Sequence, residues 1–558
     1  MTQGPEGVGI EELIEETGGC GRYQVLLSAI IHSCKCIVCF SMLFMVYGAA
    51  APDWWCSEGI ELENITSGAA FSLVCDREWI SSTITSIQMA GIFVGNIACG
   101  QVADLIGRRK PFFASILALV LLNIGTAFSV SWVMFAVSRF LIGVSVGFEL
   151  TVQYSLAAEF TQARWRTWVV AIPSWAIETS LFALVCWTLN DWLWIHIATA
   201  ATGIPLLFTY WFVPESFRWY IGHDRIEDAK KVVQKMAQFN RKPVPKSLDY
   251  IGKGNAEGGD QKYFFSDLFK EKKLRLYTCL FMIVWMTLGI TSYGIQFGVP
   301  RLSGNLFMNM FILGLASSPI QFISIWLQNR LGRKKTAWLF YGLGAAAAFA
   351  VAVTARLPDS QGQDLATNCF AITALTLVNA AWSPIQTLTI ETYPTVIRNL
   401  GYGTQNTMTR IGAIIGPQLV FLETMFEVSL YWISVTALVV AMALLVPIPE
   451  TGSTDLVDKI VLPMTPPLVE DDDSEEKQET TSLAERNDAD VWDALYDKSV
   501  STAHDVDVEP SVPRRFGRQV HRPHAPAETP SQNCKTNMYL PFVDHLLVDL
   551  DVRLLKGN

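Results

Sequence analysis

The stretch GQVADLIGRRK, residues 100–110, joins two long apolar runs, and a shortened copy, QNRLGRKK, joins two others at residues 328–335. In both copies a Gly-Arg turn carries further cations, which a tight loop would hold in water at the level of the lipid phosphates. Asp104 of the first copy is placed to pair with these cations, whereas the second copy has Asn329. The copies lie about six apolar runs apart, which predicts two similar six-helix halves.

The apolar runs define the class of protein. Of 558 residues, 51% are apolar and 17% are charged, a composition too apolar for a soluble globular chain. A helix needs about 20 apolar residues to cross a hydrocarbon core roughly 30 Å thick. The runs therefore predict an all-α integral membrane protein with twelve transmembrane helices in two six-helix halves. The predicted helices cover residues 23–50, 80–102, 111–128, 132–158, 168–189, 193–213, 276–298, 305–328, 337–355, 367–390, 401–422 and 427–448.

The distribution of Lys and Arg indicates the orientation. Cytoplasmic loops of membrane proteins carry an excess of these residues. With the N-terminus in the cytoplasm, the cations of both Gly-Arg loops fall on the inner side, and the outer loops hold few, namely Arg77, Arg301 and Arg356. Both termini are then cytoplasmic. The predicted divisions are an N-terminus (1–22), a first half (23–213) with an outer loop (51–79), a central cytoplasmic loop (214–275), a second half (276–448) and a cytoplasmic tail (449–558).

The outer loop 51–79 holds Cys56, Cys75 and a glycosylation sequon at Asn64. A disulfide between the two cysteines and a glycan on Asn64 are expected on an oxidising outer face. No metal site is predicted, because helical spacing scatters the other clustered cysteines, near residue 36, around the first helix.

The tail, residues 449–558, differs in composition from the rest of the chain. Segments such as VEDDDSEEKQETTSLAERNDAD have too little apolar surface to fold alone, so we expect a disordered acidic tail. Its last twenty residues, YLPFVDHLLVDLDVRLLKGN, are more apolar and are compatible with a short amphipathic helix that docks on a cytoplasmic partner or on the membrane surface.

Four charged residues lie near the middle of predicted helices. Lys35 is about twelve residues into the first run, Glu149 lies deep in the fourth, Glu178 lies about ten residues into the fifth, and Arg410 lies nine residues after the start of the eleventh. A charge at the bilayer centre costs roughly 2.5–3.5 kcal/mol on insertion scales, and such charges usually face a polar cavity or a partner. The alternative is a purely structural pairing of Lys35 with Glu149 or Glu178.

Several strings carry a family resemblance. The G-x-x-x-D-x-x-G-R-R-K pattern of residues 100–110 resembles the signature of the major facilitator superfamily. The resemblance covers about residues 20–460 and is specific to the organic cation, organic anion and carnitine transporter family. The strings similar to motifs of that family are CGRYQ (20–24), FSLVCDREW (71–79), VPESFRWYIG (213–222), IETYPTVIRNLGYG (390–403) and IPETGSTDLVDKI (448–460).

The resemblance implies a major facilitator fold, in which spans 1, 4, 7 and 10 line a central cavity and spans 2, 5, 8 and 11 flank it. The four buried charges then fall on cavity-lining or cavity-flanking spans. Cation-type members carry Asp at the position of Arg410, whereas anion-type and carnitine-type members carry Arg. Neither subfamily pattern is complete. Ser317 stands where cation-type and carnitine-type members typically carry an acid, and Gln321 stands where anion-type members often carry a Lys.

The resemblance and the buried charges together define the candidate residues. Aromatic and amide groups near the charges suit bulky or quaternary-ammonium ligands. The predicted substrate-binding residues are Arg410, Glu149, Glu178, Lys35, Tyr154, Tyr293, Trp382 and Gln386. The residues predicted to form inner gates are Asp104, Gly107, Arg108, Arg109, Glu159, Glu215, Gly332, Arg333 and Glu391.

The expected function is transport of small organic ions by alternating access, with an organic anion or a carnitine-like zwitterion favoured over a simple cation. An organic cation transporter of the same family, a sugar-porter-like uniporter and a non-transporting receptor or scaffold are the alternatives. No enzyme activity, cofactor or nucleic-acid partner is expected. The expected partners are the organic ion, the lipid bilayer of the plasma membrane and a cytoplasmic partner of the tail, and co-transport of H⁺ or Na⁺ stays open.

Overall fold

The computed structural model describes seven stretches of the chain, which form helices, short 3-10 turns and loops. All of them belong to the first of two units, residues 1–462; the second unit is residues 463–558. The predicted disulfide, the glycosylation sequon and nearly all of the tail lie outside the described residues. The described stretches are 10–48, 77–162, 174–245, 265–357, 361–394, 397–426 and 429–451.

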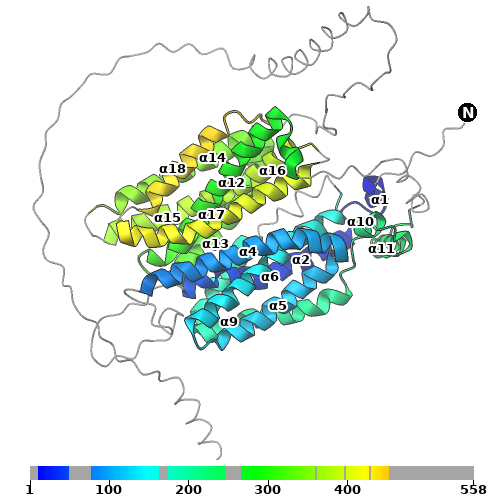
Figure 1. Ribbon diagram of the computed structural model, residues 1–558, viewed down its shortest axis with the longest axis horizontal. Coiled ribbons are helices and arrows are strands. Elements are labelled where there is room, and N and C mark those ends of the chain that lie inside the picture. The colour runs from blue at the N-terminus through cyan, green and yellow to red at the C-terminus, as the bar shows by residue number, and fades with distance from the viewer. Residues whose placement is uncertain are drawn as a thin grey trace, which may run out of the picture. The chain divides into compact units, whose positions relative to one another are not determined.

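Each predicted membrane span contains a helix (Figure 1). The first half is built from α2 (Arg22–Gly48), α4 (Glu78–Ile106), α5 (Arg109–Ala127), α6 (Trp132–Glu159), α8 (Ser174–Leu189) and α9 (Trp192–Leu207). The second half is built from α12 (Lys272–Gly298), α13 (Leu306–Leu331), α14 (Arg333–Thr354), α15 (Gln361–Ala380), α16 (Trp382–Thr392), α17 (Arg398–Phe426) and α18 (Leu430–Leu444). The halves pack on each other through α4 against α17 and α8 against α13.

The lengths and compositions of the helices suit a membrane. Among the described residues, nine helical segments are long and apolar enough to span a bilayer, with α15 and α16 counted together. The described parts of α8 and α18 are apolar but shorter, at 16 and 15 residues. Helix α17 is 29 residues long, and it begins with the polar sequence RNLGYGTQNTMTR, which lowers its mean hydropathy.

The tenth predicted span is interrupted, because α15 ends at Ala380 and α16 begins at Trp382. Pro384 explains the interruption, since proline has no N–H to donate to the carbonyl four residues earlier. That carbonyl, on Ala380, instead accepts a hydrogen bond from Ser324 Oγ of α13 at 2.7 Å. The break therefore lies directly before two candidate site residues, Trp382 and Gln386.

Short helices lie beyond the inner ends of the spans and were not predicted. They are α1 (Ile10–Glu16), α10 (Phe217–Gly222) and α11 (Ile226–Phe239). Asn240, which caps α11, accepts a hydrogen bond from Tyr23 N at 2.8 Å and donates one to Thr17 O at 2.9 Å. These bonds hold the start of α2 against the segment that joins the two halves. Within α11, hydrogen bonds from Arg225 and Lys231 lower the pKa of the exposed Asp228 carboxyl.

Glycines bring two pairs of helices into backbone contact. Between α12 and α17, a Cβ on Gly289 would lie 2.3 Å from Thr409 O, and one on Gly412 would lie 2.3 Å from Met286 O. Between α4 and α6, a Cβ on Gly95 would lie 2.2 Å from Val144 O. Small residues allow such close approach in membranes, where packing rather than the hydrophobic effect holds helices together.

Replacing Gly412 by Ala should force α12 and α17 apart, because its new methyl group would overlap the Met286 carbonyl. Overpacking of this kind costs about 1–3 kcal/mol. We expect a lower melting temperature for the purified protein. Gly403 lies in the same helix, and a methyl group added there would meet no atom within 4 Å, so Gly403→Ala is the matched control and should melt close to the unmodified protein. Equal melting temperatures for the two variants would contradict the packing argument.

Candidate functional site

The first half contains a buried cluster of one cation and two acids. Lys35 of α2, Glu149 of α6 and Glu178 of α8 are 4%, 0% and 7% exposed. Lys35 Nζ donates to Ser174 Oγ of α8 at 3.0 Å, and Lys35 lies within electrostatic range of both carboxyl groups. The structure therefore brings together three of the predicted substrate-binding residues, on the three helices to which the sequence assigned them.

The acids in this cluster lack protein donors. Within the described residues, neither oxygen of Glu149 has a hydrogen-bond partner, and the same holds for Oε2 of Glu178. Gln153 follows Glu149 by one helical turn on the same face of α6, and both polar atoms of its buried amide are also without a partner among those residues. Burying such groups unpaired costs several kcal/mol, so this face of α6 is suited to a polar ligand.

Arg410 lies in the second half, on α17, and is 7% exposed. Its Nη1 donates to the hydroxyl of Tyr293 on α12 at 3.0 Å. With the oxygen and nitrogen of the Asn96 amide on α4 assigned to suit their neighbours, the oxygen accepts from Arg410 Nε at 3.1 Å and the nitrogen donates to Gly147 O at 2.9 Å. Arg410 thus contacts both halves of the protein, and Thr151, which also contacts Asn96, lies two residues from Glu149.

The other candidate residues divide into three cases. Trp382 donates from Nε1 to Ser292 Oγ of α12 at 3.1 Å, so it contacts the residue directly before Tyr293. Gln386 donates to Tyr402 OH at 2.8 Å and is held within the second half. Tyr154 lies on α6, but its side chain is outside the described part of the structure.

The inner end of the first half is held by a second charge cluster. Arg108 lies 2.6 Å from Asp104 Oδ1 and 3.1 Å from Glu159 Oε1. Glu215 accepts hydrogen bonds from the backbone N–H groups of Arg108 and Arg109, at 2.7 and 3.1 Å, so its carboxylate caps the start of α5. These five residues were all predicted as gating residues.

Gly107 and Gly332 occupy equivalent turns before these capped helices. Their φ values are +98° and +102°, a conformation that favours glycine. A Cβ on Gly107 would lie 2.2 Å from Glu215 Oε2, and one on Gly332 would lie 2.6 Å from Glu450 Oε2. Glycine therefore permits both the turn and the close approach of the carboxylate.

The second half repeats the arrangement with a residue that the prediction omitted. Arg333 pairs with Glu391 at 3.0 Å, and Glu450 accepts from the N–H groups of Arg333 and Lys334 at 2.6 and 3.1 Å. Glu450 follows the last span in a Pro-Glu pair, as Glu215 follows the sixth. This second repeat, of the Pro-Glu pair, was the feature of the sequence that pointed to Glu450.

Each inner cluster ties helices within one half. The partners of Arg108 lie in the first half or at Glu215, two residues after it, and those of Arg333 lie in the second half or at Glu450, two residues after it. The predicted role of these residues as inner gates that break and re-form stays a prediction. In the described residues, the contacts given above brace each half internally.

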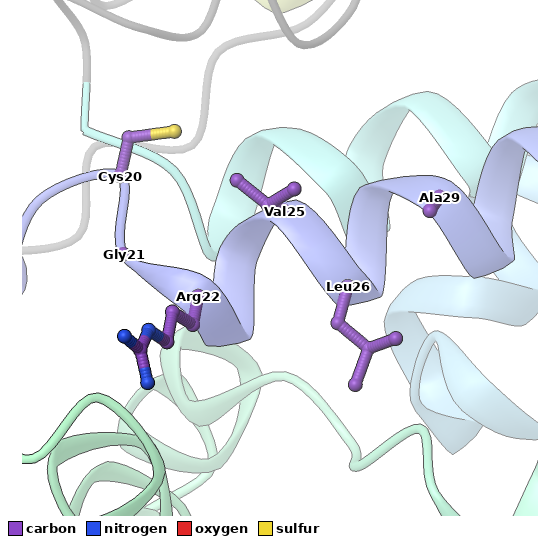
Figure 2. A pocket seen from close by; sticks show the side chains of 6 residues that line it. All are labelled: Cys20, Gly21, Arg22, Val25, Leu26 and Ala29. Atoms are coloured by element: carbon purple, nitrogen blue, oxygen red, sulfur yellow. The ribbon is translucent and has the colours of Figure 1, made fainter.

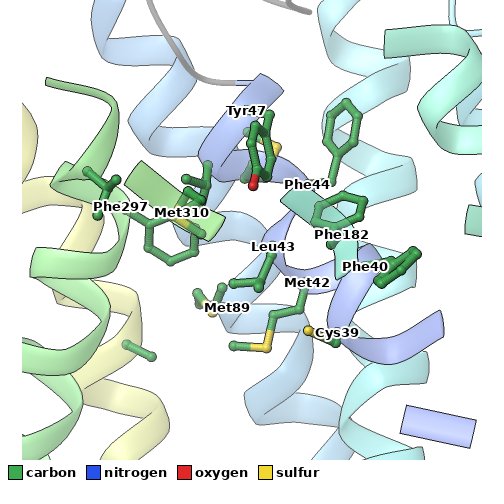
Figure 3. Close-up of a cluster of buried hydrophobic side chains, with 14 of the residues drawn as sticks. Cys39, Phe40, Met42, Leu43, Phe44, Tyr47, Met89, Phe182, Phe297 and Met310 are labelled. Atoms are coloured by element: carbon green, nitrogen blue, oxygen red, sulfur yellow. The ribbon is translucent and has the colours of Figure 1, made fainter. Parts of the chain in front are cut away.

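Contacts between the halves lie toward the opposite end. Ser86 Oγ of α4 donates to Ile414 O of α17 at 2.8 Å, and Ser180 Oγ of α8 donates to Phe311 O of α13 at 3.1 Å. The rings of Tyr47 and Phe307 stack with centroids 5.6 Å apart. Figure 3 shows Tyr47 of α2 near Met310 and Phe297 of the second half, in one buried apolar cluster. The predicted outer end is therefore closed by apolar side chains from both halves.

Arg139 is a buried charge that sequence reasoning missed. It lies on α6, is 0% exposed, and donates to Gln88 Oε1 at 2.6 Å and to the Ser41 carbonyl at 2.5 Å. Within the described residues no carboxylate pairs with it, and its guanidinium lies 5.0 Å from the centre of the Phe44 ring. The signal was an Arg inside the fourth apolar run, seven residues after its start.

A surface hollow in the described part of the chain lies away from these charges. It occurs at the start of α2, where Figure 2 shows its lining side chains. Its position, more than one helical turn before Lys35, excludes it from the buried cluster. The hollow is lined by Cys20, Gly21, Arg22, Val25, Leu26 and Ala29.

Comparisons with known proteins identify the class. The model of the sugar (and other) transporter family matches residues 29–457. A partially occluded, inward-open structure of the xylose transporter XylE from E. coli aligns with a TM-score of 0.59 at 15% identity, covering 78% of this chain and all of that one. A crystal structure of the D-xylose–proton symporter aligns with a TM-score of 0.56 at 15% identity, covering 77% of this chain and 99% of that one. The predicted all-α major facilitator fold is thereby confirmed.

Curated relatives show which transporters of this class the chain resembles. Solute carrier family 22 member 7 of Rattus norvegicus is 28% identical over 424 residues, which cover 73% of this chain and 77% of the relative. Human solute carrier family 22 member 13 is 27% identical over 70% of each chain. An organic cation transporter protein of Drosophila melanogaster is 27% identical over 62% of this chain and 65% of the relative. The chain belongs to the sugar (and other) transporter family of the major facilitator superfamily, and the expected likeness to organic ion transporters is confirmed. It is a multi-pass membrane transporter.

Replacing Glu450 by Gln should destabilise the second half, because the charge that caps α14 is lost while the N–H groups of Arg333 and Lys334 keep only a neutral acceptor. Hydrogen bonds to charged groups contribute about 1.5–3 kcal/mol. We expect a lower melting temperature. Glu227→Gln, at a side chain 79% exposed on α11, is the control and should leave melting unchanged. An E450Q protein as stable as the unmodified one would refute the capping role.

Proposed function

We propose that this transporter moves small organic ions by alternating access, and that it favours an organic anion or a carnitine-like zwitterion over a simple cation. The observation that carries the proposal is the separation of buried charges by half. The acids Glu149 and Glu178 lie in the first half, and Arg410 lies in the second. A ligand with a positive and a negative group would engage both halves at once.

Arg410 makes the proposed site selective for substrates that carry a negative group. A guanidinium presents a planar fork of N–H donors that suits a carboxylate or a sulfate. Tyr293 and Asn96 hold two of its nitrogens and fix its orientation. Because both partners are neutral, the positive charge of Arg410 stays uncompensated by them and is available to an anionic group.

The aromatic groups near Arg410 add apolar contact area. Tyr293 stacks on Phe297 with ring centroids 6.4 Å apart, and Trp382 contacts the edge of Trp285 at 5.8 Å between centroids. Aromatic faces also attract quaternary ammonium groups. A neutral sugar would require none of the buried charges, which makes the sugar-porter alternative the weaker one.

The contacts between halves support alternating access. The closed end is held by a buried apolar cluster, a ring stack and hydrogen bonds of Ser86 and Ser180, including one from Gln418 Nε2 to Ser86 Oγ at 3.0 Å, while the charge clusters at the Gly-Arg turns brace each half separately. Halves that are braced internally and that meet, among the described residues, without ion pairs at this end can rock about a central site. We place the protein in the plasma membrane with both termini in the cytoplasm.

Replacing Arg410 by Ala should abolish uptake of labelled carnitine and of labelled benzoate, because both carry a carboxylate. Loss of an interaction with a charged group costs about 1.5–3 kcal/mol, or roughly tenfold or more in affinity. Uptake into expressing cells measures the effect, with surface expression determined in parallel. Arg330→Ala, at an exposed position of α13, is the control. Normal carnitine and benzoate uptake by R410A would rule out this site.

Cross-linking the closed end should stop transport, because Tyr47 and Phe307 must separate when that end opens. In a protein carrying Tyr47→Cys and Phe307→Cys, a short bifunctional thiol reagent should link the two cysteines and block uptake. Mass spectrometry establishes the link, and each single-cysteine variant treated with the reagent controls for the natural cysteines. Full uptake by the linked protein would show that this end does not open.

A further inference from the structure

We propose that Glu149 carries a proton when no substrate is bound and releases it when the ammonium group of a substrate binds beside it, so that transport exchanges one proton for that group. This inference rests on the proposed function and concerns the same site. It adds the identity of the coupling ion. The sequence alone did not decide between H⁺ and Na⁺.

The composition of the cluster requires a balancing positive charge. Lys35 is the one cation within electrostatic range of Glu149 in the described structure, and two acids share it. With all three groups ionised the cluster has a net charge of −1. Because an uncompensated charge in a low-dielectric interior is costly, the cluster takes up either a proton or an external cation. The two states have the same total charge, so they can replace each other.

Glu149 is the group best placed to hold the proton. Its side chain is fully buried, and within the described residues no protein donor stabilises either oxygen as a carboxylate. Glu178 differs, because Ser174 is placed to donate to its carboxyl group and also contacts Lys35. Ser174 therefore gives Glu178 a protein donor, which Glu149 lacks within the described residues, while Lys35 lies within range of both acids.

The neighbouring helices offer Glu149 no second cation at the same depth in the described structure. Helices α2, α4 and α5 pack against α6, and α8 contributes Glu178. Arg410 approaches from α17 but is bound by Tyr293 and Asn96. The titratable or charged groups on these elements that interact with Glu149 are Cys34 and Lys35 on α2, Cys99 on α4 and Glu178 on α8. Others on the same helices include His32, Cys36 and Cys39 on α2, Asp104 on α4, Arg109 and Lys110 at the start of α5, Arg139 and Glu159 on α6 and Cys186 on α8.

The exchange is a balanced proton transfer. The O–H bond of the Glu149 carboxyl breaks, the proton passes to water on the side to which the site is open, and the substrate ammonium takes its place beside the carboxylate. Gln153, whose buried amide lacks a protein partner among the described residues, lies one turn away and can accept a hydrogen bond from a primary or secondary ammonium. Release on the other side reverses the step. Arg410 keeps the anionic group of a zwitterion and takes no part in the proton transfer.

The full-length protein in proteoliposomes provides the test. The probes are labelled carnitine, tetraethylammonium and benzoate, with the membrane potential clamped by valinomycin and potassium. When the interior is about one pH unit more acidic than the exterior, one-for-one exchange should accumulate carnitine or tetraethylammonium up to about tenfold. A pH dye trapped inside should report alkalinisation as the probe enters. Benzoate has no cationic group and should show neither effect.

Three variants test whether Glu149 is the residue that carries the proton. Glu149→Gln should abolish both gradient-driven accumulation and the dye response, Glu149→Asp should retain them, and Glu227→Gln on the exposed face of α11 should match the unmodified protein. If Glu149→Gln does not fold, the measurements on the unmodified protein still test whether substrate uptake is coupled to proton movement.

The results also separate this inference from the proposed function. Carnitine or tetraethylammonium uptake without proton movement, or coupled uptake by E149Q, would overturn the inference and leave the proposed function standing. Uptake of benzoate alone would overturn it as well. Uptake of none of the three probes at any pH would contradict the proposed function and the inference together.

Discussion

The interaction between Arg410 and its neutral partners is the constraint on which the site depends. A guanidinium held by a phenol and an amide is oriented without being neutralised. Pairing it with a carboxylate would remove its attraction for an anionic ligand, and leaving it without hydrogen bonds would make its burial too costly. Tyr293 and Asn96 satisfy both requirements. They also come from different halves, so the orientation of Arg410 depends on how the halves meet.

The rest of the architecture maintains these contacts. Backbone contact at Gly289 and Gly412 sets the distance between α12 and α17, and therefore the distance between Tyr293 and Arg410. Contact at Gly95 does the same for α4 and α6, which carry Asn96 and Glu149. The capping carboxylates at the Gly-Arg turns fix the helix ends of each half. Close packing and end capping thus serve one purpose, which is to keep buried charges at fixed positions.

Much of this was predictable from sequence, for physical reasons. The length of apolar runs follows from the thickness of the bilayer, and a helix lies within each of the twelve predicted runs. A charge inside such a run is visible without a structure, as with Lys35, Glu149, Glu178 and Arg410. The break at Ala381 was missed because apolar content continues across Pro384, and only the local loss of an N–H donor interrupts the helix. Glu450 was missed because its importance comes from the distant N–H groups that it caps. The lack of a protein hydrogen-bond donor to Glu149 within the described residues could not be predicted from the sequence, since it depends on which side chains face it.

The hydroxyl contacts between the halves have a consequence for the conformational change. Ser86 and Ser180 each donate to a carbonyl of the opposite half, and each lies in a helix whose own carbonyl four residues earlier is within reach of a serine hydroxyl. When the halves separate, each hydroxyl can rotate from the foreign carbonyl to the one in its own helix. Neither hydroxyl is left unsatisfied on the way. In the alternating-access cycle proposed above, both serine hydroxyls can thus keep an acceptor while the halves separate.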